Sequence, residues 1–301
     1  MQKEKIKIIS DYDGLELDTL IYIPDNIKGI VQIAHGMCDH KERYIHFLET
    51  LANNGYVACI HDHRGHGESV KSKDDLGYFY DKTGHAIVDD VHQITIYLRE
   101  RFKNVPLTLF GHSMGSLVVR VYAKKYDKDI DKLIVCGSPS YNPAANAALV
   151  LIDMDTMIKG GKYRSKTFTA MGTGAYNNAF PNEPINSWLS VNKQNVIDYC
   201  NDPKCNYMFT LNGYHNLMIL MKETYNNSDW LVNNPNLPIL FISGSDDPCA
   251  ISKEKWEDSM THMKSIGYKN IKSKMYKGYR HEILNEDIKE EVHKDILNFI
   301  K

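Results

Sequence analysis

The stretch Leu107-Thr-Leu-Phe-Gly-His-Ser-Met-Gly-Ser-Leu-Val-Val119 joins two apolar runs through the pattern Gly-x-Ser-x-Gly. The first run is short and typical of a buried β-strand, whereas Met114–Tyr126 has the spacing of a helix. Glycines at positions 111 and 115 remove side chains that would collide across a sharp strand-to-helix turn. The pattern predicts a turn that presents the Ser113 hydroxyl as a nucleophile, and a serine that only caps the helix is the alternative.

Strand-like and helix-like patterns alternate along the rest of the chain. The expected strands are Lys5–Ile9, Leu15–Ile23, Ile30–Ala34, Val57–His61, Leu107–Phe110, Leu133–Cys136, Ile239–Ser243 and Ile271–Tyr276. The expected helices are Arg43–Asn53, Ala86–Phe102, Met114–Tyr126, Lys253–Ile266 and Ile288–Ile300. The first two strands suit an antiparallel meander, and several others are apolar throughout, as strands buried on both faces are. We therefore expect an α/β protein with an eight-stranded, mostly parallel sheet flanked by helices.

The alternation stops between Cys136 and Ile239, where no clear strand occurs. Ala144–Ile158 and Asn216–Tyr225 have helical patterns, and both are rich in apolar residues. Six of the 12 methionines lie in this part of the chain, at positions 154, 157, 171, 208, 218 and 221. We expect residues 140–235 to form an inserted, mainly helical cap, and residues 1–139 and 236–301 to form the core.

The charge, hydropathy and cysteine content of the chain argue against nucleic-acid binding and against a membrane-spanning segment. The 301 residues include 36 Lys and Arg against 38 Asp and Glu, a net charge of −2 that gives no basic field for nucleic acid. The longest uncharged run, Leu133–Ile152, holds two prolines and is a poor membrane span. Six scattered cysteines and no apolar N-terminal run favour reduced thiols in the cytoplasm.

A serine nucleophile needs a base, and the base needs an acid that orients it. His281 follows the last expected strand, from where it can reach Ser113 across the sheet edge. Asp246 and Asp247 follow the strand before it, and their adjacency leaves the choice of acid open. The backbone N–H of Met114, the residue after the nucleophile, is one expected donor to an oxyanion.

Five motifs together carry a family resemblance. They are His35-Gly-Met-Cys-Asp-His40, Asp62-His-Arg-Gly-His-Gly-Glu-Ser69, Gly111-His-Ser-Met-Gly-Ser116, Gly244-Ser-Asp-Asp-Pro248 and Arg280-His-Glu-Ile-Leu-Asn-Glu286. In this order they resemble the monoacylglycerol lipase and lysophospholipase group of serine hydrolases, which have the α/β-hydrolase fold. The resemblance implies a triad of Ser113, Asp247 and His281, and a second oxyanion donor at the N–H of Met37. Without the resemblance, His35-Gly36 reads as a simple turn that ends a strand.

Other polar clusters suggest no cofactor. The histidines of His61-Asp-His-Arg-Gly-His66 lack the spacing of a helical zinc site, and the resemblance explains this segment as a structural loop. Cys200 and Cys205 have no second pair to complete a zinc site. We expect neither a metal nor an organic cofactor, and we expect His40, His85, His92 and His293 to be solvated or ordinary helix positions.

The sequence therefore predicts a carboxylic-ester hydrolase that works through an acyl-enzyme on a small ester with an apolar acyl chain. Contact with lipid aggregates is expected, because the predicted cap helices are apolar nearly all round. An iminopeptidase, a thioesterase or a cofactor-free haloperoxidase would share the fold and the triad. A catalytically silent binding protein is a further alternative, and the oligomeric state stays open.

Overall fold

One sheet of eight strands, in the order β1-β2-β4-β3-β5-β6-β7-β8, organises the molecule in the computed structural model, which describes residues 1–301. The strands are β1 (Gln2–Ile9), β2 (Glu16–Ile23), β3 (Gly29–Ala34), β4 (Tyr56–His61), β5 (Leu107–His112), β6 (Lys132–Cys136), β7 (Ile239–Gly244) and β8 (Ile271–Tyr276). β2 pairs antiparallel with β1 and β4, and every other pairing is parallel. The expected α/β architecture and its eight strands are confirmed.

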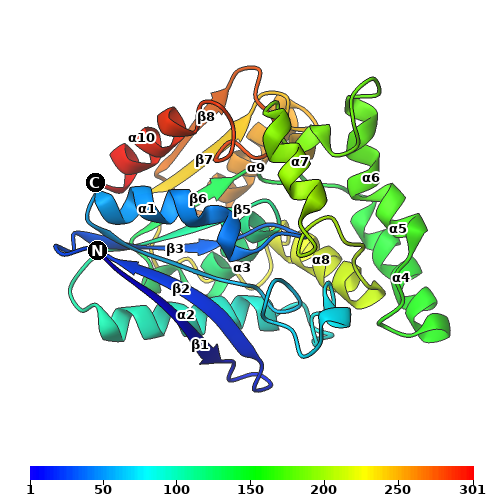
Figure 1. Ribbon diagram of the computed structural model, residues 1–301, viewed down its shortest axis with the longest axis horizontal. Helices are drawn as coiled ribbons and strands as arrows, with labels where there is room; N and C mark the ends of the chain where they lie inside the picture. Colours follow the sequence, from blue (N-terminus) through cyan, green and yellow to red (C-terminus); the bar gives the residue numbers. More distant parts are fainter.

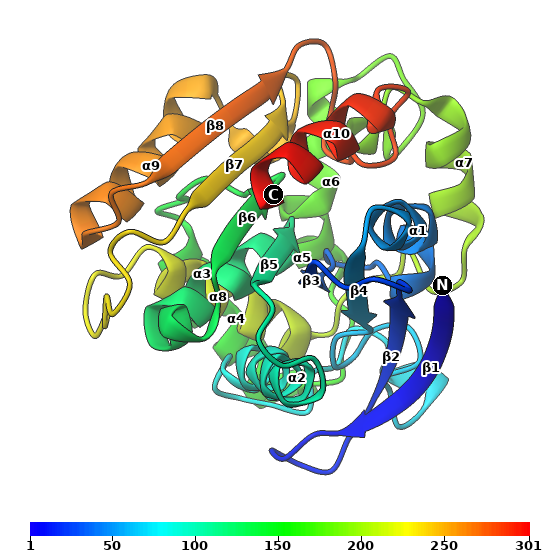
Figure 2. The same ribbon diagram turned by 90° about the vertical axis from the view of Figure 1, so that its left-hand side faces the viewer.

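Helices cover both faces of the sheet, as Figures 1 and 2 show. They are α1 (Ile45–Asn53), α2 (Ala86–Arg101), α3 (Met114–Tyr126), α9 (Lys253–Ile266) and α10 (Lys289–Ile300). Residues of α1 and α10 share one apolar cluster, and residues of α2, α3 and α9 share the other. The central strands feed both clusters because their side chains alternate, so that Leu109 of β5 faces one and Phe110 the other.

None of residues 140–235 joins the sheet. We call this segment the helical insertion, and it contains α4 (Ala145–Lys159), α5 (Lys166–Met171), α6 (Thr173–Tyr176), α7 (Lys193–Asn201) and α8 (Leu211–Thr224). Figure 1 shows these helices gathered beyond the arrowheads of the parallel strands, at their carboxyl ends. α8 packs against both α3 and α4 and so fixes the insertion to the core. The sequence predicts α4 and most of α8 but misses α5, α6 and α7, which are short or polar.

The loop after β4 is tied down by buried charges. Arg64 is fully buried, and its guanidinium donates to Asp90 at 2.7 Å and to the Phe79 carbonyl at 3.0 Å. Asp62 accepts a 2.6 Å hydrogen bond from the Lys41 ammonium. These contacts give the loop the structural role that the resemblance implies, because each buried charge has a partner of opposite sign.

Two of the four histidines expected at solvated or ordinary helix positions are buried: His40 lies in a loop, against that expectation, whereas His293 does lie on a helix, α10. His40 is 4 % exposed and His293 is 1 % exposed. The His293 ring packs against His46 and Phe47, with ring centroids at 5.4 and 4.9 Å, and its nitrogens have no hydrogen-bond partner. The sequence pattern did not indicate the burial of either side chain, because the burial of a single histidine depends on tertiary contacts.

Candidate active site

Ser113 lies at a strained turn between β5 and α3. Its φ of 54° and ψ of −118° are rare for a residue with a side chain. The turn is held because the Ser113 N–H donates to the Cys136 carbonyl at 2.9 Å. A Cβ atom at Gly115 would overlap the carbonyl oxygens of Ala34 and His35, so a side chain there would push the start of α3 away from the end of β3. The Ser113 side chain makes no capping hydrogen bond to α3, which removes the helix-cap alternative.

The loops after β7 and β8 bring Asp247 and His281 together. His281 Nδ1 lies 3.0 and 2.9 Å from the two carboxylate oxygens of Asp247. Asp247 also accepts from the Cys249 N–H at 2.9 Å and from the Ser243 hydroxyl at 3.0 Å, which fix its orientation. Asp246 is exposed and accepts instead from the Ser245 hydroxyl. The structure thus places the second of the two adjacent acids, and not the first, against the histidine.

Burial and charge act in opposite directions on this pair. Burial disfavours the charged imidazole, but the Asp247 carboxylate outweighs it and holds the pKa of His281 above its usual value. Burial likewise opposes ionisation of Asp247, yet the His281 charge and three hydrogen bonds lower the pKa of Asp247. The pair is therefore suited to holding a proton on the imidazole next to a carboxylate that stays ionised.

Ser113 and His281 line one cavity but form no hydrogen bond with each other. In ligand-free enzymes, hydrogen bonds between catalytic groups are often long and tighten when substrate binds. The chain segment that carries Met37 packs directly on Ser113, since a Cβ atom at Gly36 would lie 3.1 Å from Ser113 Cβ. The Met37 N–H has no acceptor within the protein, and the Met114 N–H belongs to the first residue of α3. Both donors thus lie beside the serine.

The cavity has a volume of about 340 Å³ and is mostly apolar, with 19 hydrophobic residues among the 29 that line it. From α4 it receives Ala145, Ala148 and Ile152, which share one helix face. From α8 it receives Leu217, Met218 and Met221. The core contributes Met37 and Leu117 beside the polar groups of the serine turn. A long apolar group can therefore lie between the insertion and the core with one end at Ser113.

The helical insertion also holds the loop that carries His281, a feature that sequence reasoning missed. Glu286 is fully buried and accepts hydrogen bonds from the Ser190 hydroxyl at 2.7 Å and from the Val191 and Asn192 N–H groups at 3.0 and 3.2 Å. The Arg280 guanidinium donates to Glu183 and lies 3.7 Å from the Phe180 ring centre. The motif from Arg280 to Glu286 already contained these charges, but not their partners.

The comparisons with known proteins agree with this geometry. Residues 25–288 match the family described as "Serine aminopeptidase, S33", so the chain belongs to this α/β-hydrolase family and is a serine hydrolase. It is 26 % identical to the "Monoglyceride lipase homolog" of Monkeypox virus, over 91 % of this chain and 89 % of that protein.

Two further proteins extend the likeness. The chain is 27 % identical to the "Monoglyceride lipase" of Homo sapiens, over 58 % of this chain and 52 % of that one. Its structure resembles a thermostable carboxyl esterase from Bacillus coagulans crystallised with glycerol, with a TM-score of 0.90 and 27 % identity over 100 % and 98 % of the two chains. No helix has the length and apolar character needed to span a bilayer.

Proposed function

We propose that the protein hydrolyses carboxylic esters of apolar acyl chains, with monoacylglycerols and lysophospholipids as the substrate class. The observation that carries this proposal is the apolar cavity that ends at Ser113, beside the His281–Asp247 pair. An acyl chain in this cavity removes methylene groups from water, each worth about 0.8 kcal/mol. The helical insertion is then the cap that selects the acyl chain.

The reaction follows from the positions of the groups. Neutral His281 takes the proton of the Ser113 hydroxyl as its oxygen attacks the ester carbonyl. The N–H groups of Met37 and Met114 bind the oxyanion, and the alcohol leaves with the proton from His281. Water, deprotonated by His281, then cleaves the acyl-enzyme and releases the acid. Asp247 keeps the imidazole oriented and stabilises its charged form in both steps, and no metal or organic cofactor takes part.

The outer face of α4 supports contact with lipid. Its apolar side chains there are Val150, Leu151, Met154, Met157 and Ile158, which are 51–84 % exposed. They lie opposite the α4 face that lines the cavity, so one helix meets both the bound chain and the solvent. We propose that this face rests on the edge of a lipid aggregate while a monomer enters. The six cysteines are free thiols, in keeping with the cytoplasm as the proposed location.

A specific observation disfavours the iminopeptidase alternative. Such an enzyme must bind a substrate ammonium group with a carboxylate that is free to accept it. The carboxylates that line the cavity are Asp39 and Glu282, and both are paired with Arg43, at 3.1 and 2.6 Å. Neither is free for a substrate. The cavity therefore favours an uncharged, apolar substrate end.

A fluorophosphonate probe followed by a substrate panel tests the proposal. We expect the native protein to be labelled and Ser113→Ala to be unlabelled while remaining folded. The panel contains monoacylglycerols, lysophospholipids, short esters and aminoacyl amides, and we expect turnover of the long-chain esters to exceed that of the amides. Equal labelling of native protein and Ser113→Ala, or a preference for aminoacyl amides, would overturn the proposal.

A further inference from the structure

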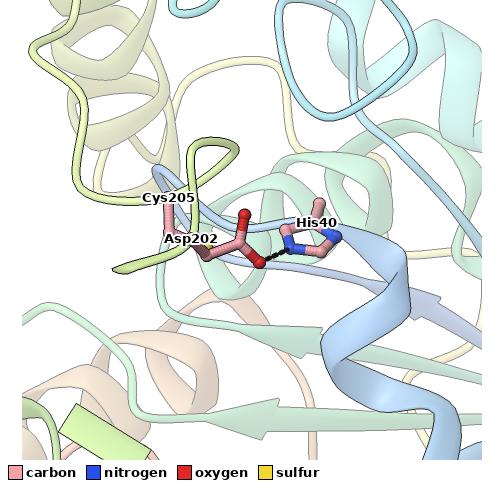
Figure 3. Close-up of side chains that lie close together, drawn as sticks. All are labelled: His40, Asp202 and Cys205. Carbon is pink, nitrogen blue, oxygen red and sulfur yellow. Dashed lines mark hydrogen bonds and ion pairs between the residues drawn. The ribbon is translucent and has the colours of Figure 1, made fainter. Parts of the chain in front are cut away.

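Three side chains of the types that can ligate a metal meet between the core and the helical insertion (Figure 3). His40 lies in the loop between β3 and α1, whereas Asp202 and Cys205 follow α7. One donor atom from each, an imidazole nitrogen, a carboxylate oxygen and the sulfur, lies within 4.8 Å of the other two. The group is assembled from segments that lie more than 160 residues apart in the sequence.

Cys205 is the member that needs an explanation. Its side chain is 3 % exposed, and its thiol forms no hydrogen bond. A buried thiol is often a small apolar filler, and Cys205 does belong to the main apolar cluster, but its sulfur also lies within 4.8 Å of an imidazole nitrogen and a carboxylate oxygen. A nitrogen, an oxygen and a sulfur ligand form a donor set that suits Zn²⁺.

The surroundings of His40 match those of a metal-binding histidine. Its Nδ1 lies 2.6 Å from a carboxylate oxygen of Glu42, so the Nδ1–H is held and Nε2 faces Asp202 at 2.8 Å. A carboxylate on the far nitrogen is the usual second partner of a histidine that ligates zinc. The other Asp202 oxygen accepts from the Lys204 N–H at 2.8 Å, so the carboxylate is oriented with Oδ2 toward His40 Nε2.

Distances and charges both permit an ion. Around a tetrahedral Zn²⁺, with bonds of about 2.0–2.3 Å, neighbouring donor atoms lie roughly 3.3–3.8 Å apart. His40 and Asp202 would therefore separate slightly, and Cys205 would need to approach by no more than about 1.5 Å. A neutral imidazole, a carboxylate and a thiolate together balance the two positive charges of the ion.

We propose that His40, Asp202 and Cys205 bind one Zn²⁺, with a water molecule in the fourth position, and that the ion pins the loop after β3 to the helical insertion. The competing explanation is a charged imidazole shared between Glu42 and Asp202, which would hold the same loops without a metal. That explanation leaves Cys205 only as a small apolar filler in the core cluster to which it belongs. The two are therefore distinguished by the cysteine.

Cobalt serves as the spectroscopic probe, and the chain offers a matched control cysteine. Cys200 is exposed on α7, five residues before Cys205, and is outside the group. After chelator treatment and dialysis, Co²⁺ is titrated into native protein, Cys200→Ser, Cys205→Ser and Glu42→Gln. We expect the native protein and Cys200→Ser to bind one equivalent with a thiolate-to-cobalt absorption band, and Zn²⁺ to displace it and raise the Tm.

Cys205→Ser should lose the band and the Zn²⁺-dependent rise in Tm, with an unchanged Tm in the absence of metal. Glu42→Gln should retain the band but weaken binding about 10- to 100-fold. Binding of less than one equivalent at micromolar cobalt by native protein overturns the proposal, as does uptake that Cys205→Ser leaves unaltered. If Cys205→Ser does not fold, His40→Gln is used in its place with the same two outcomes.

Discussion

The carboxylate of Glu282, the residue after His281, receives two hydrogen bonds from the Arg43 guanidinium, at 2.8 and 2.6 Å. Asn195 of α7 donates to the same carboxylate at 2.7 Å, and Arg43 also reaches Asp39 at 3.1 Å. A fork of two parallel hydrogen bonds fixes direction as well as distance. This ion pair therefore joins the loop before α1, the helical insertion and the loop of His281 at one buried point.

We expect Glu282→Gln to lower kcat by about 10²-fold with little change in KM, because a shift of about 1 Å in a catalytic group is enough for such a loss. Glu183→Gln is the comparison variant, since Glu183 also supports this loop through Arg280 but is 43 % exposed, so its loss should cost less than that of Glu282. Steady-state kinetics of the two folded variants checks this. A Glu282→Gln enzyme that changed only KM would assign Glu282 to substrate binding instead.

Exchange of the proposed acid should alter both the rate and its pH dependence. Asp247→Asn is expected to reduce kcat by about 10⁴-fold because the imidazole loses its correct tautomer, whereas Asp246→Asn should be mild. The Asp247 charge raises the pKa of His281, and only the neutral ring acts as a base, so its loss should move the acid limb of kcat/KM to lower pH. Equal losses in the two variants would contradict the assignment.

Cavity length should set the acyl preference. With p-nitrophenyl esters below their aggregation threshold, kcat/KM is expected to rise by up to about tenfold for each two carbons until the cavity is full. Met218→Trp should shift the optimum to shorter chains, because Met218 lines the cavity. Met157→Gln should not, because Met157 is 84 % exposed. An optimum at acetate that falls steadily with length would refute an acyl-chain cavity.

The exposed face of α4 gives a separate prediction. The double variant Met157→Gln and Ile158→Gln should lower activity on vesicle-borne or micellar monoacylglycerol several-fold, since each exposed apolar side chain contributes to insertion into a lipid surface. The same protein should keep full activity on a soluble ester. A loss on both substrates would point to damage of the fold, and no loss on either would remove the proposed lipid contact.

Buried neutral histidines should make the fold sensitive to acid. Burial, together with the nearby His46 and Lys289, lowers the pKa of His293 to about 3. In the unfolded chain the histidine binds a proton near pH 6.5, whereas in the folded chain it stays neutral. Its contribution to the free energy of unfolding is therefore complete above pH 6.5 and is lost as the pH falls.

The expected loss is about 1.4 kcal/mol per pH unit for each such histidine between roughly pH 6 and pH 4. In the variant His293→Leu, the free energy of unfolding should depend less steeply on pH, by the contribution of one proton. Urea unfolding measured across that pH range checks this. An unchanged slope would mean that His293 is already charged, or equally exposed, in the folded protein.

The sheet could be predicted from the sequence because its central strands are apolar on both faces and its helices are amphipathic. Met114–Tyr126 and Lys253–Ile266 agree with the structure to the residue. The sheet edge at which the triad candidates lie could be predicted as well, since each follows a strand whose carboxyl end lies there, but the choice of Asp247 over Asp246 came from the family resemblance. The short helices α5 and α6 could not, because six and four residues are too few to show a period.

What the sequence could not show is how distant charges pair. Glu286 reads as a charge in the last loop, yet it accepts hydrogen bonds from backbone groups near Ser190. His40 reads as one histidine among 13 and Cys205 as an unpaired cysteine, yet the fold brings them together. Such contacts depend on the relative placement of the core and the helical insertion, which no local pattern encodes.

The hydrogen bonds from the segment near Ser190 to Glu286 bear on how enzymes of this architecture diversify. A lineage that exchanged this segment for another would leave the buried Glu286 carboxylate with the Arg280 N–H as its one remaining donor. Recombination or engineered grafting would therefore have to carry Ser190-Val191-Asn192 along with the new helices. The part of the helical insertion that can be exchanged freely therefore excludes Ser190-Val191-Asn192, and a change of specificity is confined to the remaining helices.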